Sequence, residues 1–96
     1  MTRQIQIILR TDGPLWEARA NEERYKLLSL AKDNMMIESF NLSPVKYKGM
    51  LIIISGLFWA DVMLDACVPH LRLSWVEGKS LISHAINLSA IRKVVL

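Results

Sequence analysis

Residues 50–60 read MLIIISGLFWA, an uncharged stretch in a chain of 96 residues. A segment this apolar must be buried on every side, either in the middle of a small core or against another chain. Residues 51–54 are rich in β-branched side chains, which favour a strand over a helix interior. Ser55-Gly56 is typical of a turn. The sequence therefore predicts a central strand over residues 51–54.

The segment that follows this turn has two interpretations. Between residues 57 and 68 the charged side chains are Asp61 and Asp65, four positions apart. On a helix these two carboxylates would emerge together as one thin polar stripe, and Pro69 would end the helix. As strands, the same residues would form a long bent hairpin. The helix is the preferred prediction, because it brings the two carboxylates to one face.

The segments before the uncharged stretch predict a strand, a helix and a second strand. Residues 3–10 alternate in part, are rich in isoleucine and stop at a Thr-Asp-Gly-Pro turn. Residues 15–33 have helical periodicity, with Trp16 and Leu27 on the apolar side and Glu22 and Lys26 on the polar side. Residues 35–42 alternate again, and Ser43-Pro44 is expected to end that strand.

The last third predicts one strand, one short helix, and a final segment that is either a new element or a bent end. Residues 71–76 alternate and lead into a Glu-Gly-Lys-Ser turn, which indicates a strand. From Ser80 onward the polar side chains keep helical spacing opposite Leu81, Ile82 and Ile86, so a short helix capped by Ser80 is expected. The phase fails near Ser89, which makes residues 90–96 a new element or a bent end.

Taken in order, these elements predict a single α+β domain over residues 1–96. Strand, helix, strand, strand, helix, strand is the βαββαβ order of a ferredoxin-like sandwich, here with a short C-terminal extension. The other interpretation of residues 57–68 predicts an N-terminal helix plus a small antiparallel β-barrel.

The composition predicts a partner. Hydrophobic residues make up 52% of the chain, charged residues 22%, and mean hydropathy is +0.26. A domain this small has too little interior for so many apolar side chains, and a contiguous exposed apolar patch usually marks an interaction surface. We expect a homo-oligomer or an obligate protein partner. The expected interface anchors are Trp16, Phe58, Trp59 and Trp75.

Cysteine content and apolar run lengths predict a cytoplasmic protein without membrane contact. Cys67 is the single cysteine, so an intramolecular disulfide is excluded, whereas small secreted domains usually depend on such bridges. The uncharged stretch is shorter than the roughly 20 apolar residues that span a bilayer. Residues 5–9 are too short and too interrupted by glutamine for a signal peptide.

The net positive charge of the chain makes a nucleic-acid-binding module the alternative function. The net charge is +3 and the pI about 9.3, although the basic residues are spread along the chain. Tyr47 lies between Lys46 and Lys48, where an aromatic ring and two cations could contact base and phosphate together. Arg92 and Lys93 form the second basic pair. These five residues are the candidate RNA or DNA contacts.

No residue set predicts catalysis, a metal or a cofactor. Cys67, His70 and His84 fall short of the roughly four ligands of a closed zinc site, and only a carboxylate such as Asp65 could complete the set. Asp61 and Asp65 are more simply the solvent-facing stripe of an apolar helix. We therefore expect a small non-catalytic domain whose role is self-association or docking on another protein.

Two short fragments resemble a known family. Residues 37–41 (IESFN) and 84–86 (HAI) are similar to parts of the bacterial Sm-like RNA chaperones, whose small barrels form RNA-binding rings. The similarity covers about eight residues. The fragments lie much closer together in that family, and a predicted helix here replaces the strand and turn expected before the first. No functional residue is carried over from the resemblance.

Overall fold

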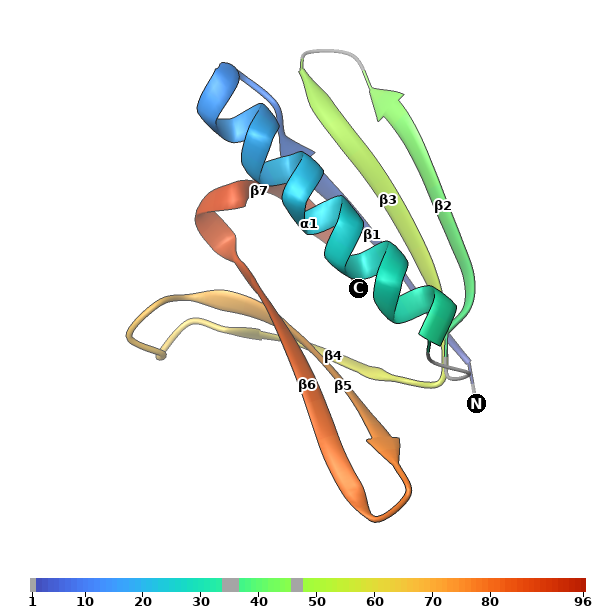
Figure 1. Cartoon of the computed structure of the whole chain (residues 1–96). Helices are drawn as coiled ribbons and strands as arrows, with labels where there is room; N and C mark the ends of the chain where they lie inside the picture. Colours follow the sequence, from blue (N-terminus) through green and yellow to red (C-terminus); the bar gives the residue numbers. More distant parts are fainter. Residues whose placement is uncertain (1, 34–36, 46–47) are drawn as a thin grey trace.

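The computed structural model describes residues 2–33, 37–45 and 48–96, which form one helix, seven strands and a short 3-10 turn (Figure 1). The strands make two antiparallel sheets, called here sheet A (order β2-β3-β1-β7) and sheet B (order β4-β5-β6). The elements are β1 (Arg3–Arg10), α1 (Pro14–Asp33), β2 (Ile37–Val45), β3 (Gly49–Gly56), β4 (Trp59–Met63), β5 (His70–Glu77), β6 (Ser80–Asn87), η1 (Leu88–Ala90) and β7 (Ile91–Val95).

Strand β1 is an inner strand of sheet A, paired with β3 and β7, and its side chains alternate strictly between the two faces. Ile5, Ile7 and Leu9 are fully buried, and the first two pair with Ile54 and Ile52 on β3. The intervening residues of β1 lie on the opposite face, which is more exposed. One face of sheet A therefore holds half of the core, while the other is open.

Helix α1 and sheet B cover the buried face of sheet A. Figure 1 shows α1 lying diagonally across β1, β3 and β2, with sheet B below it. The helix contributes Ala20 and Leu27 to the core. Sheet B contributes the residues of its inner face, which are Ala60, Leu71, Leu73, Trp75 and Ile86. A single hydrophobic cluster thus joins all three parts of the fold.

Several predicted elements are confirmed. The strand at residues 3–10, the helix at 15–33, the central strand at 51–54 and the strand at 71–76 correspond to β1, α1, β3 and β5. The strand predicted at 35–42 is β2, which continues past Pro44 to Val45, while residues 34–36 lie outside the described part.

The helix predicted over residues 57–68 is wrong. After Gly56 the chain passes through Leu57 and Phe58 into β4, where Ala60 faces the core and Asp61 faces away from it. Asp61 pairs with Arg72 on β5, and the remaining residues form the bend between β4 and β5. The spacing of the two aspartates fitted a helix, but burial in this segment follows the two-residue period of a strand.

The short helix predicted from Ser80 is also wrong, because these residues form β6. The turn that joins β5 to β6 includes Gly78 at φ +60°, a conformation that glycine adopts without strain. From this turn the chain returns antiparallel to β5, with Ile82 opposite Trp75 and Ile86 opposite Leu71. The C-terminal residues are not an extension: β7 pairs with β1 and completes sheet A.

The α+β class is confirmed, but the ferredoxin-like arrangement is not found. The described residues contain one α-helix rather than two, and their strand order differs from the predicted sandwich. The alternative of a helix followed by bent antiparallel strands is nearer, although these strands divide into two sheets. Within the described residues, no helix combines the length and apolarity needed to cross a membrane.

Candidate interaction site

The edges of the two sheets decide where another chain could pair with this one. In the described part of the chain, β2 and β7 are the outer strands of sheet A, and β4 and β6 are those of sheet B. An outer strand presents unpaired N–H and C=O groups that can bind a further strand. Proteins protect such edges with charged residues, proline, bulges or a very short strand.

Three of these four edge strands carry protection of that kind. Strand β2 includes Glu38 and Pro44 in its sequence. Strand β4 has five residues and carries Asp61. Strand β7 also has five residues, carries Arg92 and Lys93, and pairs with β1 through an irregular register. Each therefore has a feature that disfavours the addition of another strand.

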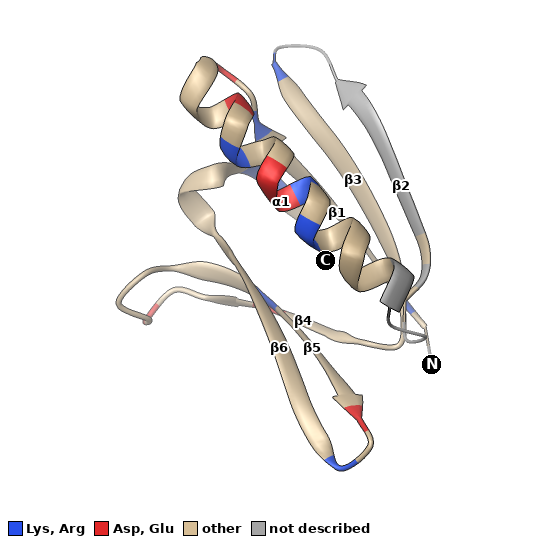
Figure 2. Ribbon diagram, in the orientation of Figure 1, with Lys and Arg blue, Asp and Glu red and all other residues tan. Residues whose placement is uncertain are grey.

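Strand β6 carries none of these sequence features, although α1 lies beside its inner side at His84. Its eight residues, SLISHAIN, include no Lys, Arg, Asp, Glu or Pro, and Figure 2 shows its ribbon free of charge colours up to the turn with β5. Leu81 is 66% exposed and lies opposite Val76, which is 39% exposed. The edge of β6 is thus long, neutral and bordered by exposed apolar side chains.

The outer face of sheet B, which points away from the core, is held by polar contacts beside this edge. Arg72 donates two hydrogen bonds to Asp61, at 3.1 Å and 2.6 Å. The hydroxyls of Ser74 and Ser83 are 3.1 Å apart and hydrogen-bonded. These side-chain contacts link β4 to β5 and β5 to β6, so they hold β6 in place within sheet B. A preformed edge of this kind loses little entropy when a strand is added.

The inner side of β6 is tied to α1. His84 Nε2 and Glu23 Oε1 are 2.5 Å apart, and both side chains are more than four-fifths buried. Beside this contact lies a groove of about 320 Å³, lined by Lys26, Ser29, Leu30 and His84. A strand added to β6 would place its inward side chains next to this groove.

The predicted interface tryptophans and Phe58 fall into three different environments. Phe58 and Trp75 are 7% and 3% exposed and belong to the core. Trp16 is half-buried, with the guanidinium groups of Arg10 and Arg19 at 4.2 Å and 5.0 Å from its ring centre. Trp59 is 58% exposed, on the outer face of sheet B. Of these four, Trp59 presents the largest exposed surface.

A second hollow lies next to Trp59. It has a volume of about 730 Å³ and is lined by Leu57, Phe58 and Trp59 together with Arg3 and Leu96. Arg3 donates a hydrogen bond from its guanidinium to the carbonyl oxygen of Ala60 at 3.3 Å. This contact links the start of β1 to β4, so Arg3 has a structural role in joining the two sheets.

The structure describes three of the five predicted nucleic-acid contacts. Lys46 and Tyr47 lie outside the described residues. Lys48 is exposed, has φ +57°, and accepts a hydrogen bond at its carbonyl from the amide of Thr11 at 2.9 Å. Arg92 and Lys93 are exposed on β7. The nucleic-acid function remains a prediction, without an aromatic platform in the described residues beside Lys48.

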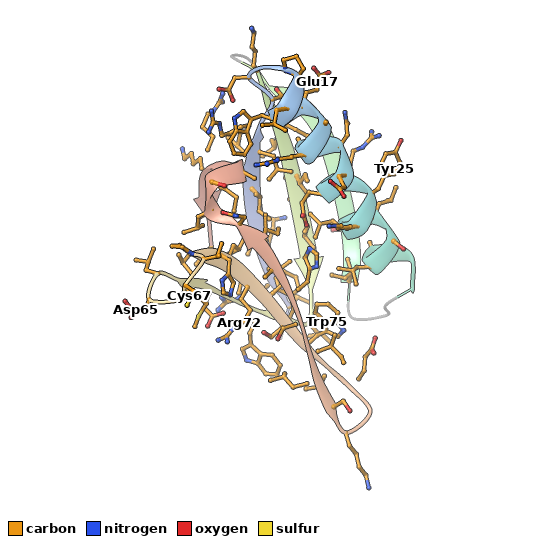
Figure 3. The ribbon with its side chains drawn as sticks, turned by 60° about the vertical axis from the view of Figure 1, so that its left-hand side comes forward. Glu17, Tyr25, Asp65, Cys67, Arg72 and Trp75 are labelled. Atoms are coloured by element: carbon orange, nitrogen blue, oxygen red, sulfur yellow. The ribbon has the colours of Figure 1, made fainter. Side chains whose placement is uncertain are left out.

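The candidate metal ligands do not converge. Cys67 and Asp65 project from the bend between β4 and β5 (Figure 3). His70 contacts the carbonyl oxygen of Val68 through Nδ1 at 2.8 Å, on the outer face of sheet B, whereas His84 lies on the inner face. Within residues 2–33, 37–45 and 48–96, no cluster of three potential metal ligands forms.

One ion pair at the start of α1 shifts a pKa strongly. The Arg10 guanidinium donates hydrogen bonds to both carboxylate oxygens of Asp12, at 2.9 Å and 2.8 Å. These bonds lower the pKa of Asp12 from its ordinary 3.8 to about 2. Because the folded-state pKa is depressed, the pair stabilises the fold above about pH 4. This contribution is lost as the pH falls toward 2.

Replacing Arg10 with methionine is expected to raise the pKa of Asp12 from about 2 toward 3.8. The substitution keeps an unbranched chain but removes the donors and the charge that stabilise the carboxylate. A carbon-detected NMR titration of the Asp12 side chain measures the change. Arg72→Met, which disrupts the equivalent pair with Asp61, is the matched control and should leave Asp12 unchanged. An Asp12 pKa that stays near 2 in Arg10→Met would contradict the assignment.

The β6 edge was missed by the reasoning from sequence. A signal was present, because Ile82, His84 and Ile86 alternate with Ser83 and Ala85 directly after a glycine turn. That pattern is typical of a hairpin strand, but the same serines also fitted a helix period.

No known protein family, curated protein or solved structure matches this chain.

Proposed function

We propose that this domain is a non-catalytic protein-interaction module that binds an extended strand at the edge of β6. The observation that carries the proposal is the character of that edge: eight residues without charge or proline, among them the exposed Leu81. Long, neutral edges are rare in proteins unless they are used, because they promote uncontrolled pairing.

Binding at this edge would follow the usual division of roles in strand addition. Main-chain hydrogen bonds to the unpaired groups of β6 supply affinity, and side chains on alternate positions supply selectivity. On the outer face the added strand would contact Leu81, Ser83 and Ala85, which are exposed. On the inner face it would meet His84 and the groove beside α1. Apolar and small polar side chains suit both surfaces.

A labelled peptide with the sequence SLISHAIN, identical to β6, provides the first test. We expect the peptide to bind the full chain saturably, as measured by fluorescence anisotropy. Binding should also protect the β6 amides from hydrogen exchange. Ala85→Lys places a charge at the edge and is expected to weaken binding by about tenfold or more, equivalent to about 1.4 kcal/mol.

Ala18→Lys is the matched control, because Ala18 is also an exposed alanine but lies on α1. This variant adds the same charge away from β6 and should bind the peptide as the native chain does. Equal affinity of Ala85→Lys and Ala18→Lys, or no saturable binding by the native chain, would overturn the proposed function.

A further inference from the structure

We infer that the strand occupying the edge of β6 is β6 of a second copy of this chain. The two strands would run antiparallel about a two-fold axis at Ser83, forming a dimer with a continuous six-stranded sheet, β4-β5-β6 followed by its symmetry copy. This inference rests on the proposed function, since it names the partner that the β6 edge binds.

The neutral character of β6 suits pairing with itself. In a symmetric antiparallel pair, β6 of one copy lies opposite β6 of the other copy. A charged residue near the two-fold axis would therefore lie close to the same charged residue of the other copy. The sequence of β6 places no such charge there. Glu77 ends β5 and Lys79 lies in the turn before β6, so the two charges at this end of the strand are opposite in sign. Self-pairing therefore brings no pair of like charges into register along the strand.

The exposed side chains select the register. Residues directly opposite each other in an antiparallel pair point to the same face of the sheet. In a symmetric pair, the two-fold axis must therefore pass between two copies of the same residue. A pair centred on Ser83 places Leu81 opposite Ala85 twice and joins the two Ser83 hydroxyls. The large exposed Leu81 is thereby covered by a small apolar neighbour. A pair centred on His84 instead opposes Leu81 with Asn87 and brings two imidazoles together, both already bound to Glu23.

The inner face is compatible with the Ser83 register. This register places Ile82 of the second copy opposite His84, at the groove of about 320 Å³ between β6 and α1. Leu30 lines that groove and is partly buried against the core. Ile82 is itself half-buried. Ile82 packs against its own core, so each copy would bring the exposed part of Ile82 beside the groove of the other copy. The two-fold axis makes this contact twice.

Single cysteines test the partner and the register together, in a chain whose native cysteine is removed by Cys67→Ser. Ser83→Cys is expected to form an intermolecular disulfide on mild oxidation, because the two α-carbons at the axis would lie about 4.5–5.5 Å apart. Leu81→Cys and Ala85→Cys should each fail to cross-link alone and should cross-link when mixed. Light scattering should show the mass rising toward twice that of the monomer with concentration.

The outcomes separate the inference from the proposed function. A chain that stays monomeric up to about millimolar concentration yet binds the SLISHAIN peptide would overturn the dimer and leave the proposed function standing. Cross-linking of Ala85→Cys alone, with none for Ser83→Cys, would overturn the register. A dimer whose affinity is the same in Ala85→Lys and Ala18→Lys would place the interface elsewhere and overturn both. Hydrogen exchange of β6 amides against concentration checks the result without any substitution.

Discussion

Trp75→Ala is expected to lower the free energy of unfolding by about 3–5 kcal/mol, the usual cost of truncating a large buried aromatic side chain. Trp75 is 3% exposed and points from β5 into the cluster that joins the two sheets and α1. A domain of this size has a total stability of about 5–15 kcal/mol, so the variant should be close to unfolding. Urea denaturation followed by circular dichroism measures the difference.

Trp59→Ala is the matched control for this prediction. Trp59 is the same residue type on the neighbouring strand, but it lies on the outer face and is 58% exposed. Its truncation should cost no more than about 1 kcal/mol, as for other exposed positions. Equal costs for the two variants would contradict the assignment of the inner and outer faces of sheet B.

Trp75→Phe separates packing from hydrogen bonding at this site. The indole Nε1 of Trp75 is buried and finds no acceptor in the described part of the chain. Phenylalanine keeps most of the apolar contact and removes this unpaired donor, whose burial is unfavourable. We expect Trp75→Phe to be clearly more stable than Trp75→Ala. A phenylalanine variant as unstable as the alanine variant would show that the whole indole is required.

The elements that sequence predicted correctly are those with strong local signals. Strand β1 combines isoleucine enrichment with a turn at Asp12-Gly13, and in the 20-residue helix α1 the apolar Ala20 and Leu27 share the face that is buried. Strand β3 is rich in β-branched side chains, so its strand conformation was predictable. The expected burial on every side is wrong, because one face of β3 is only half-buried. In each case the local pattern agrees with the type of element that forms.

The wrong predictions concern segments whose structure depends on distant partners. Asp61 was expected to share a helix face with Asp65, but its carboxylate is paired with Arg72, which lies on β5. Strand β7 pairs with β1, and these two strands come from opposite ends of the chain. Pairing at such separation leaves no trace in local periodicity, so residues 90–96 could not be assigned to sheet A.

The candidate site illustrates a similar limit. The sequence shows that residues 80–87 lack charge and proline, but not that they lie at the edge of a sheet, because edge position follows from strand order. Likewise, Trp59 and Trp75 are equivalent aromatic residues in the sequence. Their exposures differ because the two side chains point to opposite faces of sheet B. Face and edge are properties of the assembled sheet.

Ile7→Ala is expected to destabilise the fold by about 2–5 kcal/mol through lost burial and the cavity it leaves. Ile7 is fully buried at the middle of β1, where it pairs with Ile52 on one side and Val94 on the other. The truncation therefore affects three strands of sheet A at once. Thermal unfolding should show a loss of about 4–8 °C for each kcal/mol.

Ile8→Ala is the control, since it removes the same atoms and the same β-branched preference from the adjacent residue. Ile8 faces the open side of sheet A and is half-buried. Its substitution should cost well under half as much as Ile7→Ala. The difference between the two variants isolates burial from strand propensity, because both make the same change in propensity on the same strand. Similar costs would mean that the open face of sheet A is covered in solution, and that an interface larger than the β6 edge must be sought there.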